Sequence, residues 1–199
     1  MKLRTAFAVG ASLALLTALT SAPLLAASSL SRQDATVVLT KEQRVVAAFV
    51  ERVKEYVRRR EALEEKLPKL SKESKAEDIE AHKTAFQDVV RADRTGAKQG
   101  DVLDAAIAAH IRATIKKEFR GKARAELRKS ALEAETKGVP LRVNYPYPEA
   151  KELAEMPPTL LLKLPQLPKQ LRFRFVGRNM LLVDRENGLI VDYMLKAIP

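Results

Sequence analysis

Few residues in this sequence could hold a metal ion. The chain has two histidines and no cysteine. Asp78 and His82 stand four residues apart in a segment of helical periodicity, so they would share one helix face. His110 belongs to the next periodic segment. Asp78, His82 and His110 are therefore the candidate metal ligands. A tight transition-metal site usually takes more ligands than these. The simpler interpretation is that Asp78 and His82 are a solvated pair and that His110 is a partly buried histidine without a metal.

The sequence contains no motif that predicts catalysis. It has no GxSxG turn, no cysteine nucleophile, no glycine-rich phosphate loop and no zincin helix. Ser71, Ser74 and Ser130 lie in charged surroundings, and only the folded chain could bring one of them to a histidine. We therefore expect no enzymatic activity and no cofactor.

A row of cations at four-residue steps is the sequence feature that proposes a class of partner. On a helix it would follow a line of about 24 Å and could track phosphates or carboxylates. The alternative is that these cations bind no partner and only form a helix face exposed to solvent. We call the row the basic ridge, and its members are Arg112, Lys116, Arg120, Arg124 and Arg128.

The first 27 residues predict a signal peptide and place this chemistry in the cell envelope. Between Arg4 and Arg32 no charge interrupts 27 residues of mostly small and apolar character. The small residues Ala26 to Ser28 suit a peptidase, and an uncleaved inner-membrane anchor is the alternative. Export to the periplasm makes nucleic acid a poor partner and favours envelope phosphate, lipopolysaccharide or an acidic protein.

Removing the signal peptide leaves 172 residues, enough for one core, with a net charge of +9. Because the chain lacks cysteine, no disulfide can stabilise it. About a third of the residues are charged and only ten are aromatic, which is typical of a helical domain with a large surface.

Residues 28–138 form the predicted helical region. Thr40 and Gln43 have the spacing of a capping box, and the helix that they begin should end near Lys66, before Pro68. A second helix is expected over 75–93. Asp101 is expected to cap a third, whose apolar stripe drifts about 40° per step, so a break near Gly121 should divide it. The stripe is Leu103, Ile107, Ile111, Ile115, Phe119, Ala123, Leu127 and Ala131.

A proline-rich connector follows over 139–170, with seven of the ten prolines. Pro158 suits the first turn of a short helix. The leucines of this segment are too apolar to leave in water, so they should pack on the helices; they are Leu160, Leu161, Leu162, Leu164 and Leu167.

Residues 171–199 predict a three-stranded antiparallel meander with turns at Gly177–Arg178 and Arg185–Gly188. One face should be apolar and lie on the helices: Phe173, Phe175, Met180, Leu182, Leu189, Val191 and Tyr193. The opposite face should carry Arg172, Arg174, Leu181, Val183, Ile190 and Asp192. The other register would bury Asp192, and burying an unpaired carboxylate is costly, so we prefer the first.

Four segments resemble a family of exported bacterial proteins with a helical N-terminal part, a proline-rich C-terminal part and no established activity. They are YVRRREALEEKLPKLSKESKAEDIEAH, AKQGDV, VNYPYPE and LPQLPKQLRFRFVGRNMLLVDRENGLIVDY. The resemblance covers nearly all of the mature chain and implies export and this architecture. FVGRNMLLVDRENGLIVD is also similar to the last strands of small periplasmic nickel and cobalt homeostasis proteins, but the histidine-rich segment is missing and metal handling does not follow.

Together these observations predict an α+β protein: three or four helices and a small C-terminal three-stranded antiparallel sheet packed on them. The expected function is that of an exported, non-enzymatic binding or accessory protein of the bacterial cell envelope. The alternative is a periplasmic metal-responsive or metal-buffering protein that uses the candidate metal site. The sequence does not name the ligand, the pathway or the oligomeric state.

Overall fold

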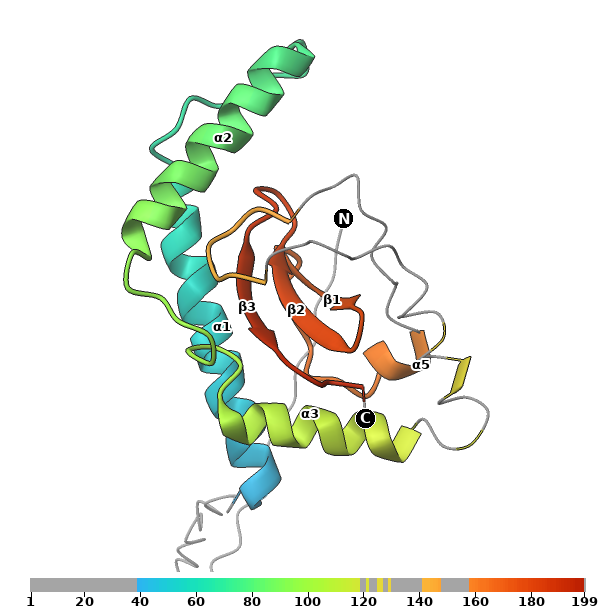
Figure 1. The fold of residues 1–199 in the computed structure, drawn as a ribbon. Helices are drawn as coiled ribbons and strands as arrows, with labels where there is room; N and C mark the ends of the chain where they lie inside the picture. The colour runs from blue at the N-terminus through green and yellow to red at the C-terminus, as the bar shows by residue number, and fades with distance from the viewer. Residues whose placement is uncertain are drawn as a thin grey trace, which may run out of the picture. The chain divides into compact units, whose positions relative to one another are not determined.

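The computed structural model describes residues 39–118, 121, 125, 126, 129, 141–147 and 158–198. The predicted signal peptide over 1–27 lies outside these residues. So do Phe119 and Arg120 of the third predicted helix and most of the chain from 122 to 140. The described part is α+β, as predicted, with helices followed by a three-stranded antiparallel sheet (Figure 1).

Helix α1 (Lys41–Glu64) begins at the predicted capping box. Thr40 accepts a hydrogen bond from the backbone N–H of Gln43, and the Gln43 side chain accepts one from the backbone N–H of Thr40. The helix ends four residues before Pro68. Its buried face is made of Phe49, Val53, Tyr56, Val57 and Arg60. The buried arginine is unusual on such a face and requires partners.

Helices α2 (Ala76–Asp93) and α3 (Ala105–Glu118) follow the predicted pattern with one correction. Asp101 does not cap α3. Asp104 does, because its Oδ1 accepts the N–H of Ile107 at 2.9 Å. Gly121, where the drifting stripe predicts a break, has a φ of 57°, a backbone conformation that favours glycine, but the residues on either side of it lie outside the described ones.

The described connector contains the short helix α5 (Pro158–Leu161), with proline in its first turn as predicted. Leu160 and Leu164 are buried in the main core. The expectation that all five leucines are covered is wrong, because Leu161 and Leu162 are exposed, Leu162 by 78%. One turn of helix can direct only part of such a cluster inward.

Strands β1 (Leu171–Val176), β2 (Asn179–Asp184) and β3 (Ile190–Met194) form the sheet in the order β1-β2-β3. The turn at Gly177–Arg178 pairs Val176 with Asn179, as predicted. Asn144 and Tyr145 lie along the outer edge of β3. The backbone N–H of Asn144 donates to the carbonyl of Ile190, and the backbone N–H of Ile190 donates to the carbonyl of Tyr145.

The predicted register of β3 is wrong beyond its start. Val183 pairs with Ile190 and Leu182 pairs with Asp192, so Val191 is the extra residue of a β-bulge. The bulge turns Asp192 to the helical side, where it is fully buried, and leaves Tyr193 half-buried on the opposite face. A bulge adds one residue and therefore reverses the alternation that follows it.

One core joins the helices to the sheet. Phe49 of α1 stacks on Phe173 of β1 with ring centroids 6.5 Å apart, and Phe175 is fully buried in the same core. The other members of the predicted core face of β1 and β2, Met180 and Leu182, are buried in the same cluster. The opposite face of the sheet carries a smaller cluster around Leu181, Val183 and Ile190.

Candidate functional site

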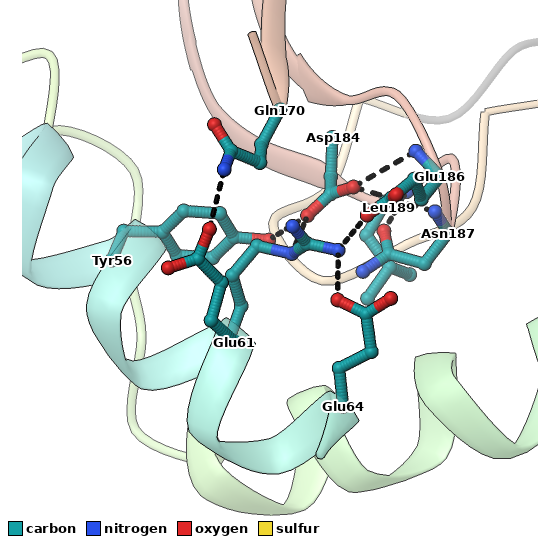
Figure 2. A network of polar contacts seen from close by, with 9 residues as sticks. Tyr56, Glu61, Glu64, Gln170, Asp184, Glu186, Asn187 and Leu189 are labelled. Carbon is teal, nitrogen blue, oxygen red and sulfur yellow. Dashed lines mark hydrogen bonds and ion pairs between the residues drawn. The ribbon is translucent and has the colours of Figure 1, made fainter. Parts of the chain in front are cut away.

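A buried polar network joins α1 to the turn between β2 and β3 (Figure 2). Arg60 is 2% exposed, and its guanidinium lies 3.1 Å from Asp184, which is fully buried. It also pairs with Glu64 at 3.0 Å and with Glu186. Tyr56, one helical turn before Arg60, donates a hydrogen bond to Asp184 at 2.8 Å. The helix spacing brings the phenol and the guanidinium to the same carboxylate.

Burial and charge shift the pKa values of this network. Burial raises the pKa of Tyr56 far above its usual range, and the charge and hydrogen bond of Asp184 add to the effect. Burial lowers the pKa of Arg60, but Asp184 and Glu186 outweigh it and the net shift is upward. The phenol is therefore neutral and the guanidinium charged at any physiological pH. These two side chains therefore hold α1 to the turn, and neither of them is suited to exchange a proton near neutrality.

A second buried carboxylate, Asp192, ties the sheet to the loop between α2 and α3. Its Oδ2 accepts the backbone N–H groups of Val102 and Leu103 at 2.8 and 2.7 Å. Gly100 donates to both oxygens, at 3.0 and 3.2 Å, and Tyr193 donates to Oδ1 at 2.7 Å. Gly100 has a φ of 92°, a backbone conformation that favours glycine. These four donors, together with the nearby charge of Arg94, explain how the carboxylate can be buried.

A cavity of about 530 Å³ opens between α1, the end of α2 and this loop. Tyr56 and Arg60 of the buried network form part of its wall, and Leu63, Val90 and Val102 provide apolar lining. Its other lining residues are Glu51, Arg52, Glu55, Arg59, Asp93, Arg94, Gly96, Ala97 and Asp101. Cavities of this size and mixed lining are typical of small-molecule sites.

A groove of about 630 Å³ lies on the other side of the same loop. Its lining has three cations, Arg91, Lys98 and Arg142, and contains no carboxylate among the described residues. Tyr145 and Tyr193 also line it, and Tyr145 is 42% exposed. We call this feature the cationic groove; its remaining members are Thr95, Ala97, Gln99, Leu141, Val143 and Asn144.

Backbone contacts hold the cationic groove in shape. Arg91 pairs with Asp88 at 2.8 Å, and its Nε donates to the carbonyl of Asn144 at 3.1 Å. Asn144 adopts a φ of 63°, and its side chain donates to the carbonyl of Arg94 at 2.7 Å. The end of α2 is thereby fixed to the segment that carries Arg142. In the described part of the chain, Lys98 and Arg142 have no ion-pair partner.

The candidate metal residues serve other contacts. Asp78 accepts the backbone N–H of Lys75 at 3.0 Å at the start of α2. The Nδ1 of His82 lies 3.0 Å from the carbonyl of Pro68, and His110 is half-buried on α3. Within the described ranges, no three histidine, aspartate or glutamate side chains come close enough to hold a metal ion.

The basic ridge is only partly described. Arg112 donates to the carbonyls of Leu195 and Lys196, at 2.9 and 3.3 Å, and so secures the end of β3 to α3. Lys116 is exposed on the same helix. Arg120, Arg124 and Arg128 lie outside the described residues. The structure therefore assigns one member of the ridge to an internal contact.

The sequence did not identify Arg94, which lines the cavity, or Arg142, which lines the cationic groove, as candidate site residues. Arg94 and Arg142 come from separate segments, and periodicity does not place such segments together. For Asp192 a local signal existed: it is an acidic residue in the middle of an apolar strand pattern, and the AKQGDV segment supplies a glycine that can turn N–H groups toward it. No helix among the described residues is long and apolar enough to cross a membrane.

Comparison with protein-family models, curated proteins and solved structures found no match to this chain.

Proposed function

We propose that this protein is an exported, non-enzymatic binding protein of the bacterial cell envelope, and that the cationic groove binds an anionic component of that envelope. The observation that carries the proposal is the lining of the groove, where three cations stand without a carboxylate in the described part. An anion there gains attraction chiefly from Lys98 and Arg142, because Arg91 is already paired with Asp88, and none of the described lining residues is a carboxylate that would repel it.

The chemistry of the lining favours phosphate groups on a surface or polymer. Arg142 offers a planar fork that matches phosphate oxygens, and Lys98 supplies a mobile point charge. Tyr145 is exposed beside them and presents an aromatic face on which a sugar or lipid headgroup can lie. The whole chain has 36 basic and 25 acidic residues, so long-range attraction to an anionic surface supports the local contacts.

Export rests on the sequence pattern of residues 1–27. Intact-mass analysis of protein recovered from the periplasm should show an N-terminus near Ala27 to Ser29. Recovery only from the membrane, with Lys2 retained, would mean that residues 1–27 stay attached as a membrane anchor. That result would overturn the prediction of a cleaved protein released into the periplasm.

The binding test uses co-sedimentation of the protein with vesicles of phosphatidylglycerol, vesicles of phosphatidylcholine, and lipopolysaccharide. Reversing both solvent-facing cations, in the double variant Lys98→Glu and Arg142→Glu, should weaken binding to anionic vesicles more than tenfold. Each such contact contributes about 1 kcal/mol near an anionic surface, and reversal adds repulsion to the loss. Binding by the wild type should also fall steeply as salt is raised.

A matched control carries the same change of net charge elsewhere. Lys41 and Arg44 are exposed in the first turn of α1 and do not line the groove. Reversing both to Glu suits the helix dipole and should change binding much less. The basic ridge supplies a rival, tested by Lys116→Glu with Arg120→Glu. Stronger loss from the ridge than from the groove, or no wild-type binding at low salt, would refute the groove as the site.

A further inference from the structure

The cavity between α1 and α2 has a charge pattern different from that of the cationic groove. It is lined by four arginines and four carboxylates as well as by apolar side chains. Pairing these charges one by one shows which of them are already neutralised by the protein and which are left for a ligand.

Six of the eight charged residues in the lining are paired within the protein. Glu51 pairs with Lys54 and Glu55 with Arg58, both on the outer face of α1 at 2.8 and 2.7 Å. Asp93 pairs with Arg59 at 2.9 Å. The remaining pairs are Arg52 with Asp104 at 2.9 Å and Arg60 with Asp184 at 3.1 Å.

Arg94 is the cation left over. Its guanidinium lies 4.9 Å from the centre of the Tyr56 ring, and its Nη2 donates to the carbonyl of Val191 at 2.8 Å. No carboxylate of the described residues forms an ion pair with it. Burial lowers the pKa of Arg94, although an arginine remains charged throughout the physiological range. A half-buried guanidinium of this kind is a receptor for a carboxylate.

Asp101 is the anion left over. Its Oδ2 accepts the backbone N–H of Lys98 at 2.7 Å, and within the described chain it has no ion pair. Burial has the largest effect on the pKa of Arg94 and lowers it, whereas electrostatic interactions with Tyr56, Asp192 and, less strongly, Asp101 raise it. Arg94 and Asp101 thus line one cavity and attract each other without forming an ion pair.

We propose that this cavity binds a zwitterion of the α-amino acid class, either a free amino acid or a short peptide with an apolar side chain. The ligand carboxylate pairs with Arg94, its ammonium group pairs with Asp101, and its side chain lies toward Leu63, Val90 and Val102. A ligand with only a negative charge fits less well, because Asp101 would repel it. A ligand with only a positive charge also fits less well, because Arg94 would repel it. The site is independent of the cationic groove and of the envelope component that the groove takes.

The test is isothermal titration calorimetry of the full chain with four probes. L-leucine and L-leucyl-L-leucine carry both charges and distinguish a free amino acid from a peptide. N-acetyl-L-leucine lacks the ammonium charge, and L-leucinamide lacks the carboxylate. We expect at least one of the two zwitterions to bind, and each of the singly charged probes to bind about tenfold more weakly or worse.

Two substitutions then assign the charges. Arg94→Gln should weaken binding of the zwitterion about tenfold or more and should leave binding of L-leucinamide equal or stronger, because a repelling cation is removed. Asp101→Asn should weaken binding of the zwitterion and leave binding of N-acetyl-L-leucine equal or stronger, because a repelling carboxylate is removed. This crossed pattern separates a ligand contact from a loss of folding, which would weaken all probes together. Arg94→Lys keeps the charge and serves as the second variant if Arg94→Gln proves unstable in thermal unfolding.

Matched controls change equal charges outside the cavity. Arg44→Gln and Asp88→Asn remove exposed charges that neither line the cavity nor pair with a residue that lines it, and they should not alter zwitterion binding. The reversal of Lys98 and Arg142 should also spare it, so failure of the groove and failure of the cavity are distinguishable. Absence of binding by both zwitterions at about 1 mM, or equal binding of leucine and N-acetyl-leucine, would overturn the proposal.

Discussion

Replacement of Asp192 by asparagine tests the reasoning on the buried carboxylate most directly. The side chain is fully buried and accepts N–H groups from Gly100, Val102, Leu103 and Tyr193. Asparagine has the same shape but replaces one oxygen by an NH₂ group. Whichever way the amide turns, that group faces at least one N–H donor, and the remaining bonds lose the assistance of the charge.

The expected magnitude follows from those contacts. One or two buried donors lose their acceptor, and each costs about 1–3 kcal/mol. We therefore expect Asp192→Asn to lower the free energy of unfolding by about 2–4 kcal/mol, against a total of about 5–15 kcal/mol for a domain of this kind. Asp192→Ala leaves all four donors without an acceptor and should bring the protein close to unfolding.

Urea unfolding followed by far-ultraviolet circular dichroism measures this change. Asp88→Asn is the control, because Asp88 is an exposed carboxylate paired with Arg91 on α2, and its loss should cost less than about 1 kcal/mol. Hydrogen exchange adds a local readout: the amides of Gly100, Val102 and Leu103 should lose protection in Asp192→Asn. A loss of stability equal to that of the control, with those amides still protected, would refute the structural role of Asp192.

Two further predictions concern α1 and the sheet. Phe175→Ala should lower the free energy of unfolding by about 3–5 kcal/mol in urea, since the ring is fully buried; a loss below about 1 kcal/mol would contradict its burial. Tyr56 has a raised pKa, so its contribution to stability is fully present below the unfolded value near 10 and is lost at higher pH. Tyr56→Phe should therefore flatten the alkaline decline in stability; an unchanged decline would refute this.

Much of the secondary structure was predictable from short stretches of sequence, because its causes are local. Thr40 and Gln43 satisfy the first N–H groups of α1 by themselves, and the two-residue turn at Gly177 and Arg178 sets the pairing of β1 with β2. The aromatic residues of β1 alternate with arginines, so the strand's core face follows from a period of two. Each of these features depends on residues within a few positions of one another.

The sites were decided by contacts between distant segments. Sequence reasoning rejected burial of Asp192 because a carboxylate without partners is costly, and its partners lie about 90 residues earlier in the chain. The same holds for Arg60 and Asp184, which meet across more than 120 residues, and for Arg94, which stacks over the ring of Tyr56. Periodicity reports which face of an element is apolar, but a buried charge is stable only where the tertiary fold brings donors or opposite charges to it.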